Sequence, residues 1–254
     1  MIHPTAIIDE SVKIGKNVQV GPWTIIGPNV VIGDDTVIYS HVVIRSDTVI
    51  GRGNQIFQFS SIGEDSADMK YKGEVTRLII GDYNIIREGV SIHRGTVQDK
   101  KETHIGNHNL LMAYVHVGHD CIVGNHIILV NNTALAGHVV IKDYARLSGY
   151  TLVHQGCCIG EYSFTGMGSG VKKDVPAYVM VYGNPAQAKC INTEGLVRAN
   201  FEQESIKIIK QGFKIIYRQG HLLAEAIDLL EKKQHSALAP LIHSLKGANR
   251  GITR

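Results

Sequence analysis

Four histidines in the middle of the chain have the residue type and spacing best suited to chemistry: His116, His119, His138 and His154. An imidazole can exchange protons near neutral pH or bind a metal ion. Asp120 directly follows His119, and an acidic neighbour can orient and polarise an imidazole. Two interpretations follow. Three of the rings could hold a zinc ion with one open position, or one ring could be a general base while the others bind an anionic substrate.

The elements that must position these histidines follow from a repeat of six residues. Every sixth residue of the range 2–62 is Ile or Val. The pattern returns over 80–92, shifts by one residue, and continues over 105–171 with Thr165 as its only polar member. The residue four positions further on is usually small or β-branched. This is a hexapeptide repeat, and chance in an Ile-rich chain does not explain it.

Six residues make one short strand and one turn, and alternating strand faces give two inward side chains per repeat. Three repeats close a triangular coil, and coils stack about 4.8 Å apart. The sequence therefore predicts a parallel β-helix with a core of Ile and Val, which accounts for its 27 glycines and 6% aromatic residues. On this coil the four histidines lie outside the inward positions, along one edge, on three successive coils.

Two polar segments, 64–78 and 95–103, interrupt the repeat. Loops on a rigid scaffold often carry binding residues, although tolerated surface insertions are the alternative. After about Pro185 the apolar residues recur at helical spacing, which predicts three or four helices that cover one end of the prism. We therefore expect a mainly β fold with an α tail: a β-helix over 1–185 and a helical region over 186–254.

Composition excludes several classes of protein. The chain has 254 residues with a net charge of +3, which argues against nucleic-acid binding through a strong basic field. Its start has no signal-peptide pattern, and no apolar stretch approaches the length of a membrane span. Cys121 and Cys157 occupy inward positions, so core filling is favoured over a nucleophilic role. The four cysteines show no disulfide pattern, so we expect reduced thiols and a cytoplasmic location.

Longer motifs carry a resemblance to a known family. Over essentially its whole length the sequence resembles the UDP-N-acetylglucosamine O-acyltransferases of lipid A biosynthesis. The resemblance implies a left-handed β-helix. It also implies transfer of an (R)-3-hydroxyacyl group from acyl carrier protein to the 3-hydroxyl of UDP-N-acetylglucosamine. The matching segments are SHVVI, IGED, DMKYKGEVTRL, SIHRGTV, NLLMAYVHVGHDCIVGN, LAGHV, LVHQ, DVPAYVMVYGNPA and INTEGLVR.

The resemblance also implies roles for individual residues. His119 matches the general base, with Asp120 beside it, and would take the proton of the sugar hydroxyl as its oxygen attacks the thioester. This is direct transfer, without a nucleophilic residue. The backbone N–H of Gly137 matches the oxyanion donor, one coil away from His119. The family's substrate contacts match His116, His138, His154 and Gln155.

More distant positions match further contacts of the family. Asp68 and Lys70 match loop residues that reach the sugar and acyl groups. Asn192, Glu194 and Arg198 match the nucleotide-binding start of the helical region. Arg198 would pair with the diphosphate, which suits the guanidinium fork. A second arginine often follows in the family, where this chain has Ala199.

The resemblance implies a homotrimer with sites between subunits, and it implies no cofactor and no metal. Basic residues beside the site would attract acyl carrier protein, which is acidic. Met167 falls where the family's acyl-length ruler sits, and its bulk predicts a preference for shorter chains.

Three other functions stay open. They are the related N-acyltransferase, a metal-dependent hydratase on the same prism, and a non-catalytic β-helix. The 3-amino analogue of UDP-N-acetylglucosamine also remains open as the acceptor.

Overall fold

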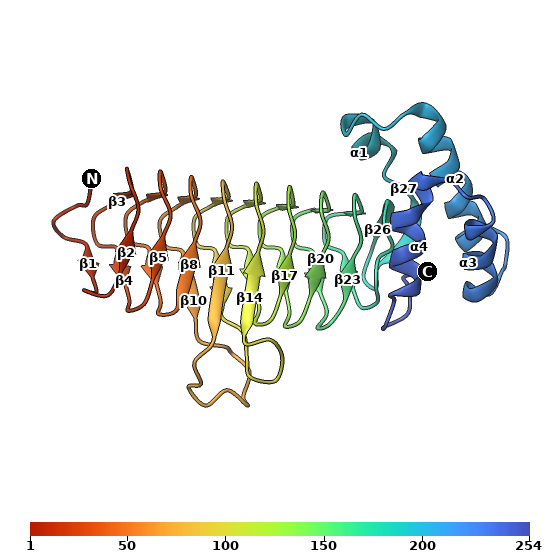
Figure 1. Cartoon of the computed structure of the whole chain (residues 1–254). Helices are drawn as coiled ribbons and strands as arrows, with labels where there is room; N and C mark the ends of the chain where they lie inside the picture. The colour runs from red at the N-terminus through yellow and green to blue at the C-terminus, as the bar shows by residue number, and fades with distance from the viewer.

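The repeats fold into strands that are mostly two residues long, and the computed structural model describes all residues 1–254. The strands form three sheets, one on each side of a long prism (Figure 1). Coils pair in parallel at an eighteen-residue interval, as Ile8 opposite Ile26 and Leu129 opposite Leu147 show. The predicted left-handed parallel β-helix with a helical tail is confirmed.

The first sheet holds nine strands and the second holds eight. Sheet 1 runs β1 (Ile7–Ile8), β4 (Ile25–Ile26), β7 (Val43–Ile44), β10 (Ser61–Glu64), β13 (Ser91–His93), β16 (His116–Val117), β19 (Ala134–Leu135), β22 (Leu152–Val153), β25 (Gly170–Val171). Sheet 2 runs β2 (Lys13–Ile14), β5 (Val31–Ile32), β8 (Thr48–Ile50), β11 (Arg77–Ile80), β14 (Glu102–Ile105), β17 (Ile122–Val123), β20 (Val140–Ile141), β23 (Cys158–Ile159).

The third sheet holds ten strands, and it ends in the C-terminal region. From the N-terminal end it runs β3 (Gln19–Val20), β6 (Val37–Ile38), β9 (Gln55–Ile56), β12 (Ile85–Ile86), β15 (Leu110–Leu111), β18 (Ile128–Leu129), β21 (Arg146–Leu147), β24 (Phe164–Thr165), β26 (Val179–Tyr182), β27 (Gln187–Ile191). The last pair, β26 and β27, is antiparallel. The sequence did not anticipate β27, which lies inside the region expected to be helical.

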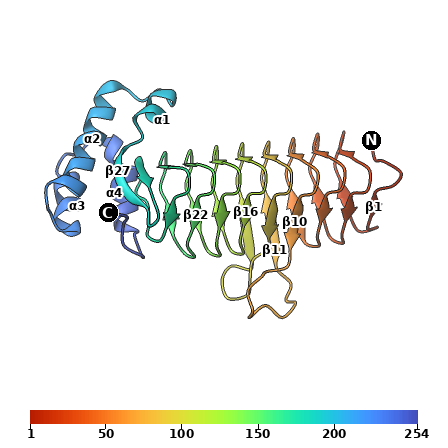
Figure 2. The ribbon, with the colours of Figure 1, turned by 180° about the vertical axis from the view of Figure 1, so that it is seen from behind.

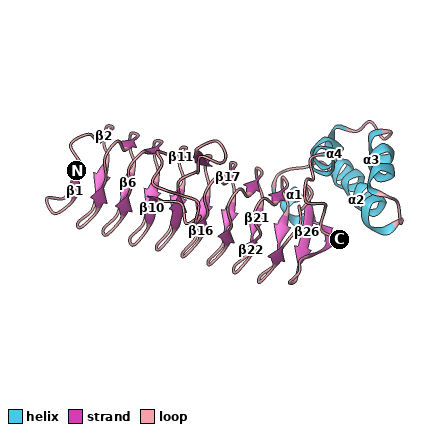
Figure 3. Cartoon of the chain, turned by 90° about the horizontal axis from the view of Figure 1, so that it is seen from below, coloured by secondary structure: helices cyan, strands magenta, loops and turns pink.

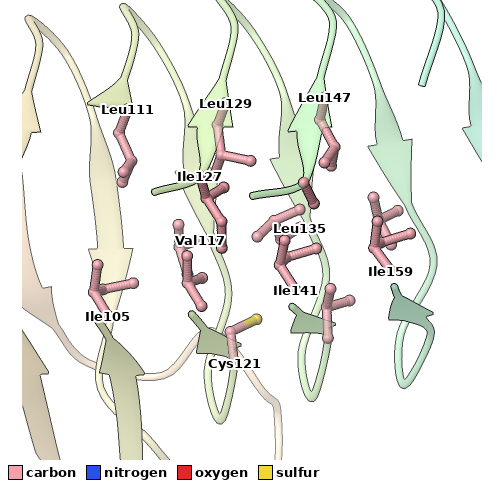
Figure 4. Close-up of a cluster of buried hydrophobic side chains, with 14 of the residues drawn as sticks. Ile105, Leu111, Val117, Cys121, Ile127, Leu129, Leu135, Ile141, Leu147 and Ile159 are labelled. Carbon is pink, nitrogen blue, oxygen red and sulfur yellow. The ribbon is translucent and has the colours of Figure 1, made fainter. Parts of the chain in front are cut away.

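The core is a column of aliphatic side chains that repeats from coil to coil (Figure 4). Leu111, Leu129 and Leu147 occupy equivalent positions and are fully buried. Cys121 and Cys157 are fully buried in the same core, which confirms that they fill inward positions. Burial raises the pKa of Cys121 to about 12 and that of Cys157 to about 11, so neither thiol ionises readily.

A row of buried asparagines replaces aliphatic side chains at one inward position. The Asn84 side chain donates to Gly106 O and to Asn54 Oδ1, at 2.9 and 3.0 Å. It accepts from the backbone N–H of Asn109 at 2.9 Å. Asn109 repeats the pattern one coil further on, accepting from Ile127 N–H. Each amide therefore satisfies turn groups that the strands leave unpaired inside the prism.

Two corners of the prism matter for function. The turns from sheet 1 to sheet 2 carry both polar insertions, which project from one side of the prism (Figure 2); we call this the loop corner. The turns from sheet 2 to sheet 3 carry stacked rings at positive φ, and we call this the aromatic corner. Successive rings there lie 4.7 to 5.2 Å apart, in the order Tyr83, His108, His126, Tyr144, Tyr162.

The helices cover the C-terminal end of the prism (Figure 3). The helices are α1 (Thr193–Arg198), α2 (Gln203–Arg218), α3 (Leu223–Glu231) and α4 (Ala239–Lys246), with a 3₁₀ turn, η1 (Ser236–Leu238). Ile209 and Phe213 of α2 and Leu245 of α4 lie in the core, as their helical spacing predicts. No helix combines the length and apolar character needed to cross a bilayer.

The asparagine row predicts a large stability effect. Replacing Asn84 with Ala leaves Gly106 O and Asn109 N–H without partners inside the prism, so we expect a loss of about 2 to 5 kcal/mol in the free energy of unfolding. Urea unfolding followed by circular dichroism measures this loss. Gln55→Ala, which changes an exposed side chain of the adjoining strand β9, is the matched control. Equal stability of the two variants would contradict the assignment.

Candidate active site

The loop corner brings together the first group of predicted residues. His119 and Asp120 lie in the turn between β16 and β17, and His138 lies in the equivalent turn one coil further on. The ring centroids of His119 and His138 are 5.1 Å apart and perpendicular. The eighteen-residue coil therefore predicts this proximity correctly.

The Asp120 carboxylate is buried and accepts three hydrogen bonds. Its Oδ1 accepts from Thr96 N–H at 2.8 Å, and its Oδ2 accepts from Thr96 Oγ1–H at 2.7 Å. Oδ2 also lies 2.8 Å from His119 Nδ1. Because a carboxylate only accepts, His119 carries its proton on Nδ1 and leaves Nε2 free to receive one.

Gly137 packs directly against the His119 ring. A Cβ at position 137 would lie 2.5 Å from His119 Nε2, so only glycine fits there. The next residue, His138, donates its N–H to His119 O at 2.9 Å. The N–H of Gly137 itself makes no hydrogen bond within the chain. It is therefore a free donor beside the imidazole, one coil away as the spacing predicts.

His119, Asp120 and His138 are the residues here that could hold a metal ion, because their ligand atoms lie within 4.8 Å of one another. The group is two histidines and one carboxylate, so the three-histidine centre considered from sequence does not form. His138 Nδ1 lies 3.1 Å from Asp99 Oδ2 of the second inserted loop. An ion on Asp120 would compete with the hydrogen bonds from Thr96 and His119.

A hollow of about 340 Å³ opens beside His119. Its lining comprises Ala67, Asp68, His93, His116, Gly118, His119, Ala136, Gly137 and Gln155. His93 and His116 meet edge to face, with ring centroids 5.0 Å apart, and His116 Nδ1 shares a hydrogen bond with Ser91 Oγ at 2.8 Å. Burial lowers the pKa of both His93 and His116 below the usual histidine range, which favours neutral rings in the hollow.

A buried arginine joins the first inserted loop to the prism. The Arg94 guanidinium donates to Gly63 O at 2.7 Å and to Tyr71 Oη at 3.1 Å, and it pairs with Asp65. Arg94 directly follows His93, so the coil that lines the hollow also holds the loop that covers it. Asp68 of that loop lines the hollow.

Two exposed residues of the predicted set, His154 and Lys70, lie outside the hollow. His154 is exposed, and its Nδ1 is 3.2 Å from Gln155 O. Lys70 is exposed in the first loop, and its backbone N–H donates to Asp68 Oδ1 at 2.9 Å. The structure thus gathers His116, His119 and His138 closely, while His154 stays at the margin of the group.

The residues expected to bind the nucleotide lie at the aromatic corner instead. Arg198 lines a second pocket there, of about 360 Å³, together with Asn192. Asn192 caps α1 by accepting from Gly195 N–H at 3.1 Å, and it donates to Tyr162 O at 2.8 Å. Glu194 is exposed and pairs with Arg198 at 3.5 Å. Within one chain this pocket and the His119 hollow occupy different corners.

Met167 lies in the turn between β24 and β25 and is 79% exposed. No part of the same chain encloses its side chain, so a tunnel end at this position needs a second surface.

Sequence reasoning missed three residues of the loop corner, namely His93, Arg94 and Thr96. The inserted loops hide their positions, because β13 pairs with β16 across 25 residues instead of eighteen. The motif SIHRGTV contains all three and was the available signal.

Two protein-family models match the chain. The model described as bacterial transferase hexapeptide (six repeats) matches residues 11–46 and 102–137. The model described as UDP-N-acetylglucosamine O-acyltransferase, domain 2, matches residues 174–253.

Known proteins match over the full length. The chain is 58% identical to an acyl-[acyl-carrier-protein]–UDP-N-acetylglucosamine O-acyltransferase of Pseudomonas aeruginosa, covering 100% of this chain and 99% of that protein. A solved structure of UDP-N-acetylglucosamine O-acyltransferase from Moraxella catarrhalis has 46% identity, a TM-score of 0.97 and coverage of 100% and 99%. The enzyme from Francisella novicida has 45% identity, a TM-score of 0.98 and coverage of 100% and 94%.

The lowered pKa values predict how stability depends on pH. The unfolded chain protonates its histidines near the ordinary pKa of 6.5, whereas the folded protein keeps His93 and His116 neutral to lower pH. Their contribution to stability is therefore complete above that pH and is lost as the pH falls. A variant with both residues changed to Asn should lose less stability between neutral and mildly acidic pH in urea unfolding. His3→Asn, at an exposed site, is the control, and an unchanged pH dependence in the double variant would contradict the assignment.

Proposed function

The chain belongs to the UDP-N-acetylglucosamine O-acyltransferase family, and from this premise we propose that His119 is the general base of its reaction. The enzyme transfers an acyl group from acyl carrier protein to UDP-N-acetylglucosamine. We further propose the finer assignment that the sequence resemblance implies. The acyl group is an (R)-3-hydroxyacyl group, the acceptor is the 3-hydroxyl of the sugar, and the product enters lipid A biosynthesis.

One observation carries the proposed mechanism. The Nδ1 of His119 is hydrogen-bonded to the buried carboxylate of Asp120, and the ring lies against Gly137, whose backbone N–H is free. Asp120 fixes the ring by the 2.8 Å contact with Nδ1, so Nε2 is the proton acceptor. Thr96 holds both oxygens of Asp120, which keeps the carboxylate in this orientation. Gly137 offers its N–H beside the ring.

The proposed steps use these groups in turn. The sugar hydroxyl oxygen attacks the thioester carbonyl carbon while its proton moves to His119 Nε2. The carbonyl oxygen becomes negative and accepts a hydrogen bond from Gly137 N–H. The carbon–sulfur bond then breaks, and the proton on His119 moves to the leaving sulfur. No cysteine is needed as a nucleophile, in keeping with the burial of Cys121 and Cys157.

Sheet 1 offers a path for the acyl chain. Outward residues of its strands line up in register from Ser91 and His116 through Ala134 and Leu152 to Gly170. This row starts at the His119 hollow and, over three coil spacings, extends about 14 Å toward the turn of Met167. Its members beyond His116 are apolar or small. We propose that the chain lies along this row and that Met167 marks its far end.

The remaining predicted contacts keep their proposed roles. His116, Gln155 and Asp68 line the hollow, and His138 lies next to His119. They support a proposed sugar and acyl site at the loop corner. His154 and Lys70 stay proposals for the margin of that site, and Asn192, Glu194 and Arg198 stay proposals for the nucleotide.

We propose that the enzyme is a homotrimer. The His119 hollow and the Arg198 pocket lie at different corners, yet His119 and His126 belong to the same coil, so the two half-sites lie at the same height. A threefold arrangement joins unlike patches of neighbouring copies and can place one subunit's loop corner against another's aromatic corner. The second surface that Met167 lacks within one chain would also come from a neighbour.

The proposed location is the cytoplasm. The cysteines support it, because all four are free thiols and two of them fill the core.

A direct assay tests the general base. With hydroxyacyl carrier protein and UDP-N-acetylglucosamine, His119→Ala should lower kcat by roughly 10²- to 10⁴-fold, because proton transfer in the transition state is lost. His3→Ala, at an exposed site far from the hollow, should retain the wild-type rate. A fully active His119→Ala enzyme would contradict the proposed mechanism. The metal content of the purified wild type should be measured together with this assay. A stoichiometric zinc ion that is required for activity would favour a metal-dependent reaction instead.

The acyl-length proposal has its own test. In an assay with a series of carrier-protein thioesters, Met167→Gly should raise the kcat/KM for longer chains relative to shorter ones by roughly tenfold, because the side chain no longer limits the groove. The wild type, run on the same series, should prefer the shorter chains. An unchanged preference in the variant would assign the ruler to another residue.

A further inference from the structure

The pocket at the aromatic corner is built to hold an anion. We call it the ladder pocket, because four of the stacked rings line it; its residues are His108, Leu110, His126, Ile128, Tyr144, Arg146, Tyr162, Asn192, Gly195, Arg198 and Ala199. Two of these residues carry a permanent positive charge and none carries a carboxylate. Two guanidinium groups without an acidic partner in the lining attract a negatively charged ligand.

Arg146 is the unexplained member of this lining. It lies on β21 and points outward from sheet 3, opposite Ile128 on one side and Phe164 on the other. Its side chain is partly buried, yet it makes no hydrogen bond, ion pair or ring contact. A partly shielded guanidinium without a partner in the chain is available to a ligand that supplies negative oxygens, which would pair with it.

Arg198 approaches the same pocket from the opposite side, on α1. Its only partner is Glu194, at 3.5 Å, and both side chains are largely exposed. Asn192 is uncharged and donates one of its two Nδ2 protons to Tyr162 O, so it offers an anion at most a single neutral donor. The charge that faces the pocket therefore comes from two arginines, one on the sheet and one on the helix.

Ala199 leaves the helical side of the pocket with a single arginine. It follows Arg198 at the end of α1 and lines the same pocket as Arg146. We infer that Arg146 supplies the second guanidinium for the diphosphate of the nucleotide, in place of an arginine at position 199. This inference rests on the proposed nucleotide role of Arg198 and extends it to a residue on another element.

Steady-state kinetics test the inference. Arg146→Ala should raise the KM for UDP-N-acetylglucosamine by roughly ten- to a hundredfold, as expected for the loss of a charged contact to phosphate. The KM for acyl carrier protein should stay within about twofold, since the removed contact is to the nucleotide. For Arg146→Lys, the KM for UDP-N-acetylglucosamine should fall between those of the wild type and Arg146→Ala, because an ammonium cannot form the bidentate contact. Arg87→Ala removes an arginine that directly follows strand β12 and pairs with Glu88, and it should leave both constants unchanged.

Rescue and direct binding separate a ligand role from a structural one. Ala199→Arg in the Arg146→Ala background should restore most of the affinity, because it returns a guanidinium to the pocket from the helix. Calorimetric titration should show that Arg146→Ala weakens the binding of UDP more than the binding of uridine, since only UDP carries the diphosphate.

Two outcomes would overturn the inference while leaving the proposed function intact. One is that the wild type is active and Arg146→Ala has the same KM for UDP-N-acetylglucosamine. The other is an equal loss of uridine and UDP binding, which would place Arg146 at the base. Failure of the wild type to bind UDP or transfer the acyl group would instead overturn the proposed function.

Discussion

Hydrogen bonding between successive coils is the constraint on which the rest of the structure depends. Each two-residue strand pairs with the strands eighteen residues before and after it, except where the loops intervene. A short strand alone has no stability in water, and each becomes stable only by stacking. The same stacking sets His119 against Gly137 and lines up His116, Ala134 and Leu152 on one face. The position of every functional group is therefore fixed by the coil interval and by its place within the coil.

Asp120 links this scaffold to the chemistry. Its own N–H donates to Thr103 Oγ1 at 2.8 Å, and its side chain accepts from Thr96 and His119. Thr96 and Thr103 are the residues at which the second inserted loop leaves and rejoins the coil. The ends of the second loop therefore hold the carboxylate that contacts the imidazole. A buried carboxylate with every oxygen occupied has little freedom to rotate, which suits the role proposed for it of orienting the same ring in every turnover.

Much of the fold and part of the site could be predicted from the sequence. The repeat of Ile and Val predicts the prism, and the count of eighteen places His119, His138 and Gly137 together because no insertion separates them. His93 and Thr96 escaped the count since the second loop changes the spacing between β13 and β16. Arg146 escaped for a different reason. The other arginine of the ladder pocket is on α1, and no periodicity relates a helix of the tail to a strand of the prism.

The placement of the two loops has a consequence for how such a protein can diverge. A single residue added within a coil would turn every later inward side chain to the outside, so changes of length are compatible with the fold mainly at corners. Both large insertions of this chain lie at the corner that carries His119. The positions that tolerate insertion thus coincide with those proposed to contact substrate. Evolution can reshape recognition there by loop length while the stacked core stays unaltered.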